Sequence, residues 1–66
     1  MMRVTARSAS DRSGDWPYWM VWNGCLNVTS EICDVLGVKR KPGQVFTDRY
    51  SAEWLAEAFN AWGEAS

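Results

Sequence analysis

The stretch Tyr18-Trp19-Met20-Val21-Trp22-Asn23-Gly24-Cys25-Leu26-Asn27-Val28 decides the fold. Its two apolar runs are rich in residues that favour β-strands, and Asn23-Gly24 lies between them. An Asn-Gly pair in this position is the strongest short-range signal of a β-hairpin, because both turn residues must adopt positive φ. The sequence therefore predicts a hairpin over residues 17–28, with Val21 opposite Leu26.

Alternation along the two strands sorts the hairpin side chains onto two faces. The uniformly apolar face, expected to be core, carries Trp19, Val21, Leu26 and Val28. The mixed face carries Tyr18, Met20, Trp22, Cys25 and Asn27. Two interpretations of the mixed face stand side by side. Either the first helix covers one face and the last helix the other, giving three layers, or the mixed face contacts a partner.

The beginning of the hairpin also allows a different interpretation. Asp15 could cap a short helix with Pro17 in its first turn, and Trp16, Trp19 and Met20 would then have helical spacing. A helix here would remove the hairpin and the mixed face with it.

A first helix is expected over about residues 30–36, directly after the hairpin. Thr29 or Ser30 is its expected cap, and Gly37 is expected to end it in the left-handed conformation. The apolar stripe of this helix places Cys33 inside the fold.

A basic turn, a short strand and a second helix follow. Lys39-Arg40-Lys41 leads to a Pro42-Gly43 turn, and residues 44–47 predict a strand that returns to the sheet. Thr47 or Asp48 is expected to cap a helix over about residues 49–62, which Gly63 stops. The stripe expected to face the sheet consists of Leu55, Ala58, Phe59 and Trp62, widened by Tyr50 or Trp54. The solvated side is expected to hold Glu53, Glu57, Asn60 and Glu64.

These elements predict an α+β fold. A small single-layer sheet, made of the β-hairpin and a short third strand, packs with two helices in the order ββαβα. Residues 1–14 are polar and rich in Ser and Arg, which is typical of a flexible N-terminal arm, although Arg3-Val4-Thr5-Ala6 could add an edge strand. Residues 15–66 are expected to form a single α+β domain, because a chain of this length allows only one.

The composition argues against catalysis and metal binding. The chain has no histidine, so the commonest general base and the commonest neutral metal ligand are missing. Two cysteines without histidine cannot complete a zinc site within one chain. Each glycine falls at a turn or a helix end rather than in a phosphate-binding loop. We therefore expect no enzymatic activity, no metal and no cofactor.

The predicted compartment is the cytoplasm, with reduced thiols, because the first residues lack the apolar stretch of a secretory signal. No segment approaches the ~20 apolar residues of a membrane span, so no membrane association is expected. The net charge of −1 is too small to attract a polyanion to the molecule as a whole.

The remaining signal is an excess of large apolar side chains. Five tryptophans in 66 residues are a heavy load for two helices and a small sheet to cover. Aromatic residues and methionine are enriched where proteins bind one another. The expected partner-binding residues are Trp16, Tyr18, Met20 and Trp22, with Lys39, Arg40 and Lys41 as a secondary patch that reads charge.

The predicted function is that of a small non-enzymatic binding module whose partner is another protein. Its small size is typical of inhibitors encoded by phages and mobile elements, so the chain is expected to be a viral protein of this kind that acts by occluding a surface of a host protein. Two alternatives stay open. A nucleic-acid-associated regulator would use the basic turn at residues 39–41 and the Arg-bearing arm, although the acidic last helix weighs against phosphate contacts. A structural homo-oligomer, with a homodimer as its simplest form, would need no other partner.

Overall fold

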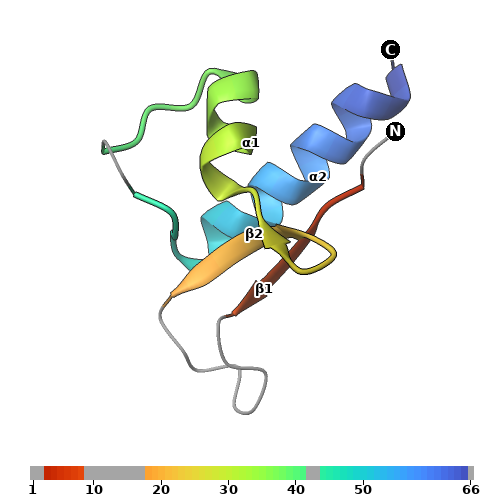
Figure 1. Ribbon diagram of the computed structural model, residues 1–66. Helices are drawn as coiled ribbons and strands as arrows, with labels where there is room; N and C mark the ends of the chain where they lie inside the picture. The colour runs from red at the N-terminus through yellow and green to blue at the C-terminus, as the bar shows by residue number, and fades with distance from the viewer. Residues whose placement is uncertain (1–2, 9–17, 42–43, 66) are drawn as a thin grey trace.

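The computed structural model describes residues 3–8, 18–41 and 44–65, and over these residues the predicted α+β class is confirmed. An antiparallel sheet packs against two helices (Figure 1). In chain order the elements are β1 (Thr5–Ser8), β2 (Trp19–Asn23), β3 (Leu26–Asn27), α1 (Thr29–Leu36) and α2 (Arg49–Ala65).

The sheet has the strand order β1-β2-β3, so the hairpin strand β2 lies in the middle. β1 belongs to the predicted flexible arm, and its register places Ala6 opposite Val21. The arm prediction is therefore wrong for residues 5–8, where the alternative edge strand forms. The physical reason is alternation: Val4 and Ser8 are buried and Ala6 packs against the core, so every second side chain is covered. Residues 9–14 of the predicted arm lie outside the described residues.

Residues 44–47 contribute one bridge instead of the predicted third strand. Trp19 and Thr47 exchange two backbone hydrogen bonds of 2.8 Å. Two residues earlier, the carbonyl oxygen of Val45 accepts a hydrogen bond of 2.9 Å from the side chain of Asn27 rather than from a strand. The order of the described elements is therefore βββαα and not ββαβα.

The hairpin turn lies at Gly24-Cys25, one residue later than predicted. Asn23 pairs with Leu26, and the amide of Val28 donates to the carbonyl of Val21 at 2.9 Å. Gly24 has a φ of 61°, and no described non-glycine residue has a positive φ. A turn of this kind needs positive φ only at its first central residue, whereas an Asn-Gly turn needs it at both. Moving the turn by one residue shifts the pairing by two, so that Leu26 lies opposite Asn23 instead of Val21. Because this shift is even, the side chains of both strands stay on their predicted faces.

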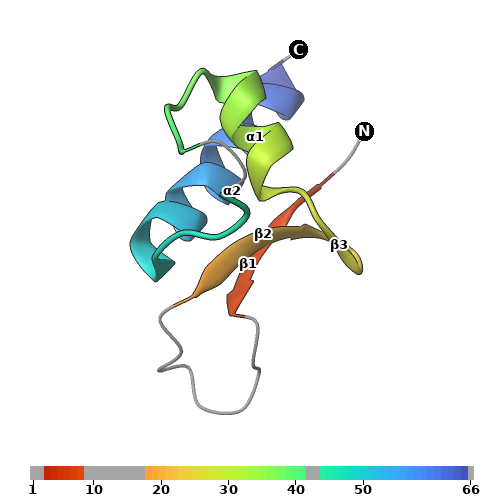
Figure 2. The ribbon, with the colours of Figure 1, turned by 60° about the vertical axis from the view of Figure 1, so that its left-hand side comes forward.

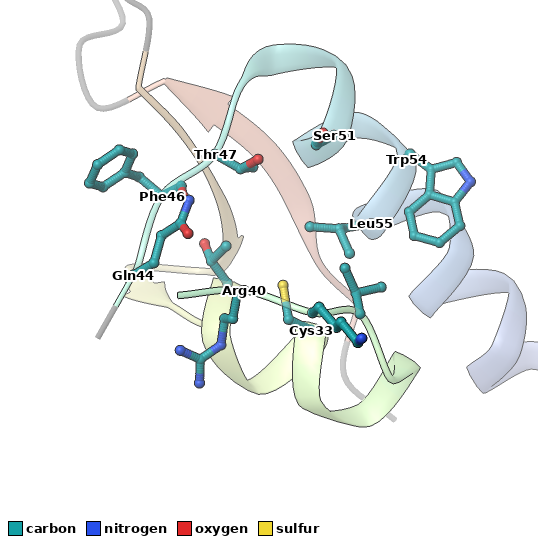
Figure 3. A pocket seen from close by; sticks show the side chains of 11 residues that line it. Cys33, Arg40, Gln44, Phe46, Thr47, Ser51, Trp54 and Leu55 are labelled. Atoms are coloured by element: carbon teal, nitrogen blue, oxygen red, sulfur yellow. Dashed lines mark hydrogen bonds between the residues drawn. The ribbon is translucent and has the colours of Figure 1, made fainter. Parts of the chain in front are cut away.

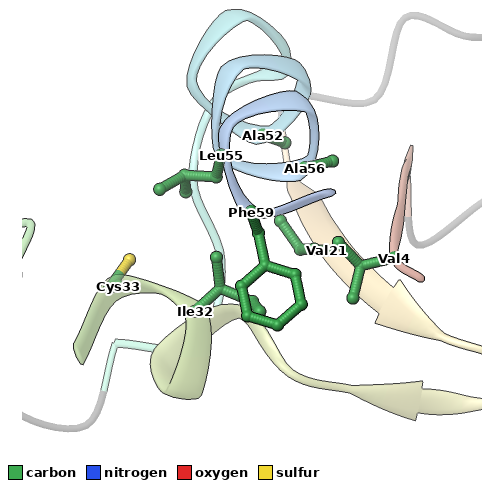
Figure 4. Close-up of a cluster of buried hydrophobic side chains, with 8 residues drawn as sticks. All are labelled: Val4, Val21, Ile32, Cys33, Ala52, Leu55, Ala56 and Phe59. Atoms are coloured by element: carbon green, nitrogen blue, oxygen red, sulfur yellow. The ribbon is translucent and has the colours of Figure 1, made fainter. Parts of the chain in front are cut away.

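Both helices lie on the same side of the sheet (Figures 1 and 2). The three-layer interpretation is therefore wrong, because the stripes of α1 and α2 meet the same apolar face and each other. The alternative helix near the start of the hairpin is also wrong for Trp19 and Met20, which begin β2. The core cluster beneath the helices consists of Val4, Val21, Ile32, Cys33, Ala52, Leu55, Ala56 and Phe59 (Figure 4). Leu26, expected in this core, is exposed because it lies next to the hairpin turn.

α1 ends as predicted, at Gly37 with a φ of 72°. The amide of Val38 donates to the carbonyl of Cys33 at 2.8 Å, and the amide of Gly37 donates to the carbonyl of Asp34 at 3.3 Å. This pair of bonds satisfies two carbonyl groups that the end of a helix leaves free. Cys33 is buried, as the stripe predicts.

α1 begins differently from the prediction, because Thr29 does not cap it. The Oγ1 atom of Thr29 accepts a hydrogen bond of 2.9 Å from the amide of Val21 and donates one of 2.7 Å to Oδ1 of Asn27. Oδ1 of Asn27 also accepts from the amide of Thr29 at 3.1 Å. Thr29 therefore joins the helix to the middle of the sheet.

The buried stripe of α2 is rotated from the predicted one. It consists of Ala52, Leu55, Ala56 and Phe59. Leu55 and Phe59 were predicted correctly, but Ala58 is only partly buried and Trp62 is exposed. Tyr50 and Trp54, expected to widen the core stripe, are exposed as well. Small side chains at 52 and 56 let the helix lie close to the sheet. α2 also runs through Gly63 to Ala65.

Asn60 was assigned to solvent, but it fastens α2 to the edge of the sheet. Its Nδ2 donates to the carbonyl of Val4 at 2.9 Å, and its Oδ1 accepts from the amide of Val4 at 3.0 Å. An amide side chain thus satisfies both backbone groups of Val4, the residue that directly precedes β1.

Asp48 caps α2. Its carboxylate accepts hydrogen bonds from the hydroxyl of Ser51 at 2.7 Å and from the amide of Ser51 at 3.1 Å. These bonds to the charged form lower the pKa of Asp48 below its ordinary value of 3.8.

We expect this cap to make the fold acid-sensitive. A lowered pKa in the folded state gives a stabilisation that is complete above pH 3.8 and is lost as the pH falls through the lowered pKa. In Asp48→Asn the side chain still caps the helix but does not titrate. The difference in melting temperature between the wild type and Asp48→Asn, measured from pH 7 down to pH 2, should shrink below about pH 4. A constant difference across this range would contradict the assignment.

Candidate binding surface

The described residues enclose a cavity between α1, α2 and the segment that connects them. Its volume is about 180 Å³. The lining residues are Thr29, Cys33, Val38, Lys39, Arg40, Gln44, Phe46, Thr47, Ser51, Trp54 and Leu55. Phe46 and Trp54 stand on opposite sides, with the Cys33 sulfur and the Leu55 side chain between them (Figure 3).

The floor of the cavity is apolar and unreactive. Cys33 and Leu55 both belong to the core cluster, so the cavity opens directly above the core. Burial raises the pKa of the Cys33 thiol, with a smaller opposing effect from Arg40. A thiol of raised pKa stays protonated at neutral pH, and the protonated form is a poor nucleophile. Cys33 therefore serves packing in this cavity.

Exposed aromatic side chains lie at and beside the edge of the cavity. Trp54 is 55% exposed and Phe46 is 41% exposed, although both line the cavity. Tyr18 packs edge-on against Phe46, with 4.8 Å between the ring centroids. Tyr50, one helical turn before Trp54, is 85% exposed. We call Tyr18, Phe46, Tyr50 and Trp54 the aromatic rim.

The basic turn lies beside the same cavity. Lys39 and Arg40 line it, and both Lys39 and Lys41 are exposed. Arg40 is mostly covered, and its guanidinium lies 3.4 Å from the carboxylate of Asp34. Within the described part of the chain, neither lysine has an ion-pair partner. The free positive charge of this surface is therefore carried by the two lysines.

Met20 and Trp22, from the mixed face of the hairpin, alternate with the core residue Val21 and therefore lie on the side of the sheet away from the helices. Met20 is buried. Trp22 is partly buried, and its indole N–H donates to the carbonyl of Arg7 at 3.3 Å. The guanidinium of Arg7 lies 5.1 Å from the centroid of the Trp22 ring and donates to the carbonyl of Gly24 at 2.7 Å. The Trp22 ring is thus already in contact with Arg7 of its own chain. Trp16 lies outside the described residues.

The structure therefore divides the predicted partner-binding residues. Tyr18, Lys39 and Arg40 lie at the cavity or its rim, and Lys41 follows in the same turn, whereas Met20 and Trp22 belong to the other face of the sheet.

The prediction did not include Phe46, Tyr50 and Trp54 among the binding residues. The sequence does contain a signal for them. A second apolar row on the helix consists of Tyr50, Trp54, Ala58 and Ala61, which follow one another at intervals of three or four residues. This row lies beside the core stripe, and a shallow hollow of about 200 Å³ runs along it, lined by Trp54, Glu57, Ala58 and Ala61.

The described ranges contain no group of three or more potential metal ligands. None of the helices within them is long and apolar enough to cross a membrane. Comparison with protein-family models, with curated protein sequences and with solved structures finds no match to the chain.

Proposed function

We propose that this chain is a cytoplasmic, non-enzymatic module that binds another protein and occludes a surface of it. The observation that carries the proposal is the cavity of about 180 Å³ flanked by the exposed rings of Phe46 and Trp54. Exposed aromatic side chains around a hollow are typical of the anchor points at which a few residues supply most of the binding energy.

The size of the cavity favours a protein partner over a metabolite. Pockets for small molecules usually have volumes of roughly 300–1,000 Å³. A cavity of about 150 Å³ is large enough for benzene. The cavity of this chain, at about 180 Å³, therefore suits one leucine or phenylalanine side chain.

The hydroxyl groups in the cavity support a role without catalysis. Ser51 donates to Asp48 at 2.7 Å and Thr47 donates to the same carboxylate at 3.3 Å. Since these hydrogen bonds lower the pKa of Asp48, its carboxylate is a weak general base. The third hydroxyl, that of Thr29, donates to Asn27. None of the three hydroxyls is paired with a histidine, which the chain lacks.

The arginines in the part of the chain that the structure describes offer little support for nucleic acid as the partner. Arg3 pairs with Glu64 at 2.6 Å, Arg40 with Asp34, and Arg49 with Glu53 at 2.9 Å. Arg7 is held against Trp22. A surface that neutralises phosphates needs several free basic groups in a row.

The proposal is tested by selecting binding peptides and mapping where they bind. Displayed 12-residue peptides would be selected on the immobilised chain, and the affinity of the best peptide measured by fluorescence anisotropy. Trp54→Ala should weaken binding by at least about 30-fold, because truncation of an anchor residue costs about 2 kcal/mol or more. Trp22→Ala, the matched removal of an indole on the other face of the sheet, should leave the affinity unchanged.

Two results would count against the cavity as the binding site. One is a selection that enriches no specific peptide. The other is a peptide whose affinity falls with Trp22→Ala and not with Trp54→Ala. The melting temperatures of both variants, measured beside the affinities, separate a lost contact from a lost fold.

A further inference from the structure

The charge lining the cavity has one sign. Among its lining residues Lys39 and Arg40 are positive, and no aspartate or glutamate is present. The chain as a whole is slightly acidic, with eight carboxylates against seven basic groups. The acidic groups of α2, among them Glu53 and Glu57, lie outside this lining. Asp48 lies just outside the lining, hydrogen-bonded to Ser51 and Thr47, and Asp34 pairs with Arg40. Within the described residues, the unpaired charge in the lining is therefore the positive charge of Lys39.

Two donors at the cavity have no acceptor in the described part of the chain. The ammonium group of Lys39 is exposed and unpaired. Nε of Arg40 is buried and has no hydrogen-bond partner, although the terminal nitrogens of the same guanidinium contact Asp34 and the carbonyl of Lys41. Lys39 is therefore the donor that a partner can reach, and a carboxylate binds an ammonium group through a charge-assisted hydrogen bond.

We propose that the partner segment that occupies the cavity carries a carboxylate beside its apolar anchor. The anchor, leucine or phenylalanine, inserts between Phe46 and Trp54, and an aspartate or glutamate one or two residues away contacts Lys39. Successive Cα atoms are about 3.8 Å apart, so both groups reach the cavity and its edge from one short segment. This inference rests on the proposed function and specifies the chemistry of the partner.

The test uses two displayed libraries of eight-residue peptides with leucine or phenylalanine fixed at the centre. In one library the two flanking positions are aspartate or glutamate, and in the other they are lysine or arginine. Fluorescein-labelled winners from each are titrated with the wild type, Lys39→Glu, Trp54→Ala and Arg3→Glu. Arg3→Glu is the matched control, because it changes the net charge equally but lies near the other end of α2, beside Glu64.

The acidic peptides should bind the wild type at least about tenfold more tightly than the basic ones, since complementary charge discriminates between partners. Lys39→Glu should reverse this preference, and Arg3→Glu should preserve it. Raising the salt concentration from 50 to 300 mM should weaken the acidic peptides more than the basic ones, because salt screens exposed charge pairs.

The outcomes separate this inference from the proposed function. Suppose that peptides from both libraries bind with equal affinity, that binding depends on Trp54, and that Lys39→Glu and Arg3→Glu have the same effect. The proposed carboxylate on the partner is then wrong, but the proposed protein-binding function is retained. If neither library binds, or if Trp54→Ala has no effect, both proposals are overturned. Sedimentation of the free chain across a range of concentrations gives the remaining outcome. A dimer that Trp54→Ala abolishes would place a second copy in the cavity and overturn the acidic segment.

Discussion

Replacing Phe59 with alanine is expected to destabilise the fold by about 3–5 kcal/mol, the usual cost of removing a buried aromatic ring. Phe59 is 6% exposed and lies in the core cluster between the sheet and both helices (Figure 4). A domain of this length has a total stability of roughly 3–10 kcal/mol. The change therefore removes much or all of the stability, and urea unfolding followed by circular dichroism at 222 nm should show a large fall in the midpoint.

Tyr50→Ala is the control for this measurement, because it removes an aromatic ring from the same helix at a position that is 85% exposed. Its effect should stay within about 0.5 kcal/mol, as for most surface substitutions. Equal losses in the two variants would mean that α2 packs against the sheet through a different face.

Replacing Thr29 with valine is expected to cost about 1–3 kcal/mol, although the two side chains have nearly the same shape. The hydroxyl of Thr29 accepts the amide proton of Val21 at the centre of the core, and Thr29 is 2% exposed. Valine leaves that amide buried without an acceptor. The loss is measured by urea unfolding, and faster hydrogen exchange of the Val21 amide should accompany it.

Thr29→Ser distinguishes the hydrogen bonds from the packing of the methyl group. Serine keeps both hydrogen bonds and removes only the methyl, so its cost should be clearly smaller than that of valine. A serine variant as unstable as the valine variant, with unchanged exchange at Val21, would show that the methyl group matters more than the hydroxyl.

Local chemistry made much of the hairpin and of α1 predictable. Glycine is the residue type that most readily takes the left-handed conformation at a helix end, and Gly37 takes it at the end of α1. The division of the hairpin into two faces also holds, although the turn is at Gly24-Cys25. The division into faces changes only if the pairing shifts by an odd number of residues. The turn lies one residue later than predicted, which shifts the pairing by two, so the division is unchanged.

The orientation of α2 was not predictable in the same way, because its sequence offers two apolar rows. The row with the larger side chains, Tyr50 and Trp54, is exposed, and the row with Ala52 and Ala56 is buried. Which row faces the sheet depends on how closely helix and sheet can approach, and that depends on residues far apart in the chain. The cavity has the same origin, since α1, α2 and their connection each supply part of its wall. Hydrophobicity alone therefore predicted binding through aromatic residues, but it selected those of the hairpin instead of Phe46 and Trp54, which line the cavity.

The bidentate pairing of Asn60 with Val4 bears on how the chain acquires its structure during synthesis. Fifty-six positions separate the two residues. On a ribosome, Val4 emerges long before Asn60, and until then the two backbone groups of Val4 lack the partner that they have in the folded chain. β1 can pair with β2, and α1 can join the hairpin, before α2 exists, but the core cluster is complete only after α2 has been made. Folding of this small domain is therefore expected to be a late, nearly all-or-none event rather than a gradual one.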